Sequence, residues 1–216
     1  PINSDVGTLN VAVTSTDLGG LSATDTFALT IQNVNDAPTV GNPLADQSVL
    51  EDATFSIQIP ATTFADQDAN DVLTYSASLA NGTALPTWLS FDVATRTFTG
   101  TPDDAQVGSL DLKVTATDTG NLSASDTFTL TVTNVNEAPT VAAPLADQRA
   151  TQGTGFTMVV PASTFADVDA GDALTYSATL ATGAALPTWL SFNPATRTFS
   201  GTPQGGDVGA LDVRVT

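Results

Sequence analysis

The chain of 216 residues contains no cysteine and no histidine. Without cysteine there is no disulfide bond, no thiolate metal site and no cysteine nucleophile. Without histidine, the common Ser-His-Asp and Cys-His arrangements of nucleophilic enzymes are excluded. Glu51 and Glu137 are the only glutamates, and the aspartates lie in repeated turns, which argues against a catalytic carboxylate pair. These absences predict a protein that is not an enzyme.

Basic residues are also scarce, with five lysines and arginines against 23 acidic residues and a formal net charge of −18. Nucleic acids and anionic membranes bind basic faces, so we expect neither as a partner. No apolar run approaches the length needed to span a bilayer, and we expect no membrane insertion. Cations are the natural partners of such a chain. The lack of disulfides favours a bacterial exported protein over a secreted eukaryotic one.

What the chain has in abundance is internal repetition. The stretch YSASLANGTALPTWLSFDVATRTFTGTP (75–102) returns as YSATLATGAALPTWLSFNPATRTFSGTP (176–203), at an offset of 101 residues and with 22 of 28 positions identical. A fixed period is strong evidence for tandem repeats. We therefore predict the C-terminal part of a first repeat (1–37), a complete second repeat (38–138) and a third repeat that lacks its last strand (139–216).

Strand signals dominate each repeat. Apolar and polar residues alternate in 55–60, 73–79, 110–117 and 127–134, and residues 89–100 have the pattern of a hairpin. We count about seven short strands per repeat, separated by Gly, Pro, Asn and Asp clusters. No segment keeps a helical period beyond two turns. The pattern predicts an all-β fold of tandem immunoglobulin-like antiparallel β-sandwiches.

The predicted division leaves two incomplete sheets. Residues 1–37 supply only two strands, and a lone hairpin is marginally stable in water, so its apolar face needs a cover. The third repeat ends with an open sheet edge. Neighbouring repeats of a longer array are the first expected partners. The alternative is strand addition, in which the N-terminal hairpin of one molecule completes the third repeat of another copy.

Oxygen-bearing side chains gather in three kinds of segment. FADQDAND (64–71) and FADVDAGD (165–172) each carry a D-x-D pair before a strand. NVND (33–36) and NVNE (134–137) precede Ala-Pro in two linkers, and Asp118 follows a strand. In a sandwich these segments lie at one pole, and Ca²⁺ prefers such oxygen ligands on irregular loops. The alternative is that they only occupy turns and strand ends of an acidic surface.

The segments that carry a family resemblance are DQDANDVLTYSA, ATDTGNLSASDTFTLTV, NVNEAPTV and above all LPTWLSFD…TRTFTGTP. Through them the chain resembles two kinds of repeat in large bacterial surface proteins, RTX-type adhesins among them. These are the dystroglycan-type cadherin-like repeats and the He-PIG immunoglobulin-like repeats, and the resemblance covers essentially the whole chain. It implies cadherin-like sandwiches, a secreted or cell-surface location, and Ca²⁺ between consecutive repeats. Carried onto this sequence, the ligands are Asn35, Asp36, Asp66, Asp68 and Asp118 at one junction and Asn136, Glu137, Asp167 and Asp169 at the next.

The sequence departs from the cadherin pattern in ways that remove carboxylates. The first linker residue is Asn33 or Asn134 instead of aspartate, and TRTFTGTP replaces the acidic element of the preceding repeat. Glu51, the counterpart of an early-strand glutamate, becomes Gln152 in the third repeat. Fewer carboxylates predict Ca²⁺ affinities in the millimolar to submillimolar range of extracellular modules.

Two further residue types invite a ligand-binding interpretation. Trp88 and Trp189, in LPTWLSF, resemble sugar-stacking platforms, but each begins a strand beside Leu and Phe, so we expect them in the core. We expect Arg96 and Arg197 to brace a hairpin or to pair with a carboxylate.

The function predicted from the sequence is a non-enzymatic repeat module of a bacterial surface adhesin or fibre, acting as a Ca²⁺-stiffened spacer or cell-adhesion array. The alternative is an accessory carbohydrate-binding module of a secreted polysaccharide-active enzyme, which would contact sugar through Tyr, Trp and Asn.

Overall fold

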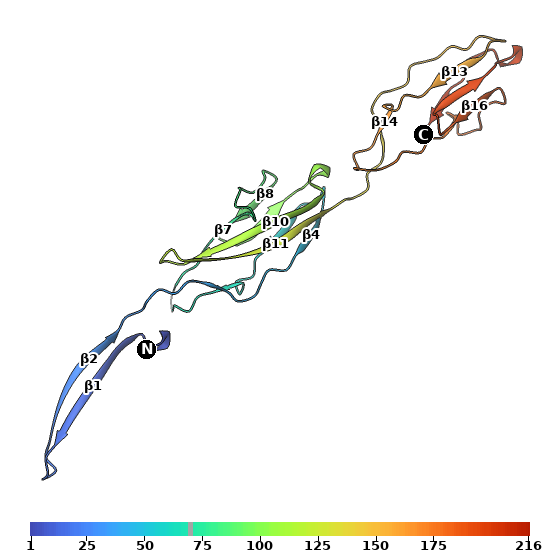
Figure 1. Ribbon diagram of the computed structural model, residues 1–216. Helices are drawn as coiled ribbons and strands as arrows, with labels where there is room; N and C mark the ends of the chain where they lie inside the picture. Colours follow the sequence, from blue (N-terminus) through green and yellow to red (C-terminus); the bar gives the residue numbers. More distant parts are fainter. Residues whose placement is uncertain (69–70) are drawn as a thin grey trace. The chain divides into compact units, whose positions relative to one another are not determined.

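The computed structural model describes residues 1–68 and 71–216, and it divides into two compact units, residues 1–134 and 135–216. The described residues form strands joined by turns and by three single-turn 3-10 helices (Figure 1). None of these helices has the length and apolar composition needed to cross a membrane.

The first unit begins with a hairpin of β1 (Gly7–Thr16) and β2 (Ser22–Ile31), paired antiparallel along their whole length (Figure 1). Its apolar face stays open, since Phe27 is 54% exposed and Leu9 is 53% exposed. Phe128, the counterpart of Phe27 one period later, is only 4% exposed. The same alternation therefore buries its apolar face where a second sheet covers it, and not in this hairpin.

The rest of the first unit is a sandwich of two main sheets. One sheet has the order β4 (Gln47–Leu50), β11 (Ser123–Thr133), β10 (Gly108–Thr117), β7 (Thr74–Leu79), with β4 and β11 parallel and the other neighbours antiparallel. The other has the order β5 (Phe55–Gln58), β9 (Thr97–Gly100), β8 (Leu89–Asp92), and β3 (Thr39–Val40) pairs with β6 (Phe64–Ala65). The predicted strands and the predicted hairpin at 89–100 are confirmed, as is the sandwich fold.

The core lies between these two sheets. Phe98 of β9 is fully buried and meets Phe128 of β11 edge-on, with ring centroids 5.8 Å apart. Leu112, Val114 and Leu130, which the alternation of β10 and β11 places on the inner face, are also fully buried. Each such side chain contributes about 1.5–3 kcal/mol through burial, so the apolar half of the strand pattern holds the sheets together.

The second unit repeats this plan in its own strands. One sheet has the order β13 (Phe156–Val159), β17 (Thr198–Gly201), β16 (Leu190–Asn193). Two smaller pairs join β12 (Thr140–Val141) to β14 (Phe165–Ala166) and β15 (Ala178–Leu180) to β18 (Val213–Val215). The ring centroids of Phe192 and Phe199 lie 4.6 Å apart, as do those of Phe91 and Phe98 in the first unit. The sequence repeat is thus a structural repeat.

A 3-10 turn recurs one period apart, as η1 (Asn3–Asp5), η2 (Asp104–Gln106) and η3 (Gly205–Asp207). In η2 the Asp103 carboxylate accepts a hydrogen bond from the Ala105 N–H at 2.9 Å, which closes the turn. These turns precede β1, β10 and β18, and they place Asn3 and Asp104 at equivalent positions. The alternation of the sequence gave no signal for them, because a single turn has no period.

Candidate metal centre

Asp118 lies where β10 ends, and two donors fix its carboxylate. The Leu122 N–H donates to Oδ1 at 2.8 Å and closes the turn to β11, and the Asn35 side-chain amide donates to Oδ2 at 2.9 Å. Asp118 is only 4% exposed. A Cβ added at Gly120 would lie 2.6 Å from Asn35 Cγ, so glycine makes room for the linker side chain. The linker is therefore seated against the end of β10.

Asp66, Asp71 and Asp118, which we call the strand-end group, place carboxylate oxygens within 4.8 Å of one another. Asp66 Oδ1 accepts the Asp68 N–H at 2.9 Å, and Asp71 Oδ1 accepts the Thr119 hydroxyl. Asp66 Oδ2 and Asp71 Oδ2 are buried, and none of the residues that the structure describes donates a hydrogen bond to them. Buried carboxylate oxygens are costly unless a donor or a cation satisfies them, so this group has the chemistry of a cation site.

Asn3, Asp36 and Asp68 form a second arrangement beside it, which we call the linker group. The Asp36 N–H donates to Asp68 Oδ2 at 2.6 Å, and Asp68 is 7% exposed. The side-chain amide of Asn3 donates to Asp36 Oδ2 at 2.9 Å and to Asp68 Oδ1 at 3.5 Å. The predicted ligands Asn35, Asp36, Asp66, Asp68 and Asp118 are therefore gathered at one end of the sandwich, but in two groups with different donors.

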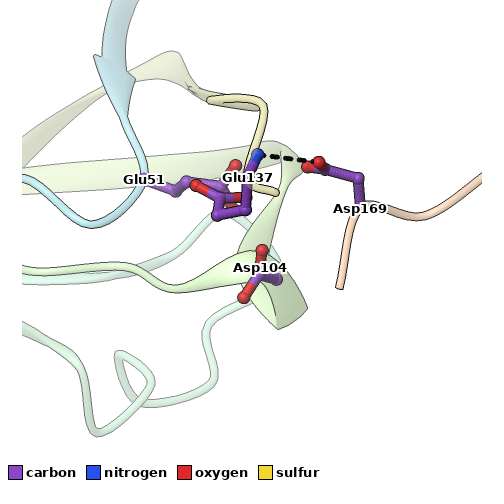
Figure 2. Close-up of side chains that lie close together, drawn as sticks. All are labelled: Glu51, Asp104, Glu137 and Asp169. Carbon is purple, nitrogen blue, oxygen red and sulfur yellow. Dashed lines mark hydrogen bonds between the residues drawn. The ribbon is translucent and has the colours of Figure 1, made fainter. Parts of the chain in front are cut away.

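The second unit carries the counterpart of this scheme. Asp167, Asp169 and Asp172 place carboxylate oxygens within 4.8 Å of one another. The Glu137 N–H donates to Asp169 Oδ2 at 2.9 Å, as Figure 2 shows, and the Asp169 N–H donates to Asp167 Oδ1 at 3.1 Å. The Asn136 amide donates to the Glu137 carbonyl at 3.0 Å. The structure thus brings the second set of predicted ligands to one place within this unit.

The structure adds acidic residues that the predicted ligand set omits. Asp71 and Asp172 were visible in the sequence as the third aspartate of D-x-D-x-x-D, and both lie in the groups described above. In the first unit, Asp104 and the buried Glu51 place carboxylate oxygens within 4.8 Å of each other (Figure 2). Asp104 lies in turn η2, just after the segment TRTFTGTP, which itself carries no acid.

The tryptophans and arginines take structural positions. Trp88 packs against the core and meets Phe55 edge-on at 6.3 Å. Trp189 packs against the smaller core of the second unit. The Arg96 guanidinium stacks over the Tyr75 ring at 5.5 Å, and its Nε donates to the Ile59 carbonyl at 3.4 Å. The expected core and hairpin-bracing roles therefore match the contacts.

The fold and the acidic loops define a class: tandem immunoglobulin-like β-sandwiches with clustered carboxylates at the end of a repeat. The chain belongs to the He_PIG family, described as "Putative Ig domain", which matches residues 37–133 and 138–216.

Two relatives of known sequence are adhesins for platelets. The serine-rich adhesin for platelets of Staphylococcus aureus (strain MRSA252) is 34% identical over 121 residues, which is 56% of this chain and 8% of that adhesin. The counterpart in strain USA300 is also 34% identical over 121 residues, which is 5% of its length. The chain therefore spans less than a tenth of the adhesins it matches.

Cadherin domains share the fold. The structure of PcdhgB3 EC1-4 matches 97% of this chain and 50% of that chain, with a TM-score of 0.60 and 19% identity. Protocadherin gammaB7 EC3-6 matches 98% of this chain and 56% of that chain, with a TM-score of 0.53 and 22% identity. The cadherin-like architecture expected from the sequence is confirmed.

Proposed function

We propose that the chain is a non-enzymatic repeat module of a bacterial surface adhesin or fibre, stiffened by Ca²⁺ at the junctions between repeats. The observation that carries this proposal is the strand-end group. Its three carboxylates converge, and Asp66 Oδ2 and Asp71 Oδ2 are buried with no hydrogen-bond donor among residues 1–68 and 71–216. A divalent cation would neutralise that charge and coordinate both oxygens.

The donor set suits Ca²⁺ better than a transition metal. The group offers carboxylate oxygens on loops, with the hydroxyl oxygen of Thr119 beside Asp71, and the chain has neither histidine nor cysteine. Hard oxygen ligands in irregular geometry are preferred by Ca²⁺, whereas Mg²⁺ demands near-ideal octahedral geometry and zinc sites use nitrogen and sulfur. Asp66, Asp71 and Asp118 would hold the ion. The cadherin-like resemblance of the repeats supports the same choice.

Stiffening follows from which segments the group joins. Asn35 and Asp36 belong to the linker before the second repeat, and they bond to Asp118 and Asp68, which belong to that repeat. An ion held by the loop and the strand end would fix the surface on which the linker lies. Removing backbone freedom from a linker costs conformational entropy, and ion binding offsets that cost. A rod of such repeats would hold a distal binding domain away from the cell.

The adhesin relatives support a secreted or cell-surface location and a role in adhesion. The neighbouring repeats of the same chain are the proposed partners. Strand addition between two copies remains the alternative partner, because the apolar face of β1–β2 is open. Light scattering after size exclusion tests it: a mass that grows with concentration favours self-association, and a constant monomer mass rejects it.

Calorimetric titration with Ca²⁺ tests the proposed function. We expect saturable binding with a dissociation constant of about 0.1–1 mM, as in other extracellular modules. Small-angle scattering should show that the chain samples a narrower range of conformations when Ca²⁺ is bound. Mg²⁺ at equal ionic strength serves as the control for charge screening. Absence of saturable Ca²⁺ binding would refute the proposal.

A further inference from the structure

The two acidic groups of the first unit differ in one respect. In the strand-end group two buried carboxylate oxygens have no donor in the part of the chain that the structure describes. In the linker group both oxygens of Asp68 accept hydrogen bonds, one from the Asp36 N–H and one from the Asn3 amide. The same amide also donates to Asp36 Oδ2 at 2.9 Å. The two carboxylates are thus already bridged by an N–H₂ group of the protein.

The Asn3 amide lies between the carboxylates of Asp36 and Asp68. Its nitrogen carries two hydrogens and a partial positive charge, and it has one carboxylate on each side. Hydrogen bonds to ionised carboxylates are stronger than neutral ones. Asparagine can therefore join Asp36 to Asp68 in the absence of metal, although it supplies no net charge.

The repeat shows what happens when this side chain changes. One period later the equivalent residue is Asp104, and two periods later it is Gly205. Asp104 cannot donate when ionised, and it lies with a carboxylate oxygen within 4.8 Å of one from Glu51. Its own Oδ1 is buried, and no described residue donates a hydrogen bond to it. The first residue of the 3-10 turn therefore changes from a hydrogen-bond bridge to an additional acid.

We propose that Asn3 is a positioning residue that closes the linker group without a metal ion, and that the side chain at this turn position sets the ion demand of each repeat. With asparagine, the linker group needs no cation and only the strand-end group binds one. With aspartate, the position becomes a further ligand. The ion count rests on the proposed function, whereas the amide bridge does not.

The bridge is tested in chelator, where metal plays no part. Asn3→Ala should raise the hydrogen-exchange rate of the Asp36 amide about tenfold, because it removes a charge-assisted contact from the carboxylates that hold this amide. Asn10→Ala is the matched control, since Asn10 is an exposed asparagine of β1, the strand that follows turn η1. An unchanged Asp36 exchange rate in Asn3→Ala would overturn the bridge.

The ion demand is tested by native mass spectrometry with Ca²⁺. Asn3→Asp should bind one more ion than the wild type, and it should melt lower in chelator and recover in Ca²⁺. The proposal on ion demand fails if the wild type binds ions but Asn3→Asp binds the same number. If the wild type binds none, the proposed function and the ion count fall, and the exchange experiment alone decides the bridge.

Discussion

The Asp118→Asn variant should be more stable than the wild type in chelator and less stable than the wild type in Ca²⁺. Asp118 lies with Asp66 and Asp71 in a group whose carboxylate oxygens are within 4.8 Å. At an effective dielectric constant of about 20, each pair of charges at that separation repels by about 3 kcal/mol. Asp118→Asn removes two of the three pairs, but asparagine has one acceptor oxygen and can keep only one of the hydrogen bonds from Leu122 and Asn35. Hydrogen bonds to an ionised carboxylate contribute about 1.5–3 kcal/mol each, and their weakening offsets much of the relieved repulsion. In chelator the variant should therefore melt only a few degrees above the wild type.

In Ca²⁺ the sign changes. For a dissociation constant of about 0.1–1 mM, roughly 10 mM Ca²⁺ stabilises the wild type by about 1.4–2.7 kcal/mol through mass action. That corresponds to a shift of several degrees for a domain of this size. The variant loses one of three carboxylate ligands and should gain much less. Calorimetric melts of both proteins in chelator, Ca²⁺ and Mg²⁺ measure the difference.

Asp17→Asn is the matched control for this experiment. Asp17 is the repeat counterpart of Asp118 and closes the same turn, accepting the Leu21 N–H at 2.8 Å, but it belongs to no acidic group among the described residues. Its substitution should leave the Ca²⁺ response intact. If wild type, Asp118→Asn and Asp17→Asn all shift equally with Ca²⁺, the strand-end group is not the ion site and the reasoning is wrong.

Three further predictions concern the scaffold. Gly120→Ala should weaken Ca²⁺ binding and destabilise the folded state by about 1–3 kcal/mol, because its Cβ would lie 2.6 Å from Asn35 Cγ. In the control Gly19→Ala, the atom nearest to the added Cβ is Asp17 Oδ1, at 3.3 Å. Calcium titration and urea unfolding compare the two variants. The Thr95 and Ala94 N–H groups lower the pKa of Asp92 below its usual 3.8. The ionised carboxylate therefore stabilises the folded state above that pH, and this stabilisation is lost as the pH falls through the lowered pKa. Asp92→Asn should remove this contribution to the pH dependence of urea midpoints measured from pH 5 to pH 2. Phe98→Ala should cost about 3–5 kcal/mol in urea unfolding, because the ring is fully buried.

The sequence by itself determined the period, the strands and the inner faces. Leu112, Val114 and Leu130 could be assigned to the core because strand alternation is a local property, written in every second residue. The recurrence of that pattern 101 residues later fixed the architecture of the next repeat. The same local signals showed which loops are rich in carboxylates, and most proposed ligands lie in those loops.

Only the tertiary structure decided how those carboxylates are grouped. Asp71 and Asp118 are 47 positions apart, and they meet because β7 pairs with β10 and brings the end of one strand beside the start of the other. Turn η2 brings Asp104 to Glu51, and turn η1 inserts Asn3 between two carboxylates. A sequence pattern records which side chains can bind a cation. Whether a carboxylate is satisfied by a cation or by an amide depends on donors that arrive through space, from segments with which it shares no periodicity.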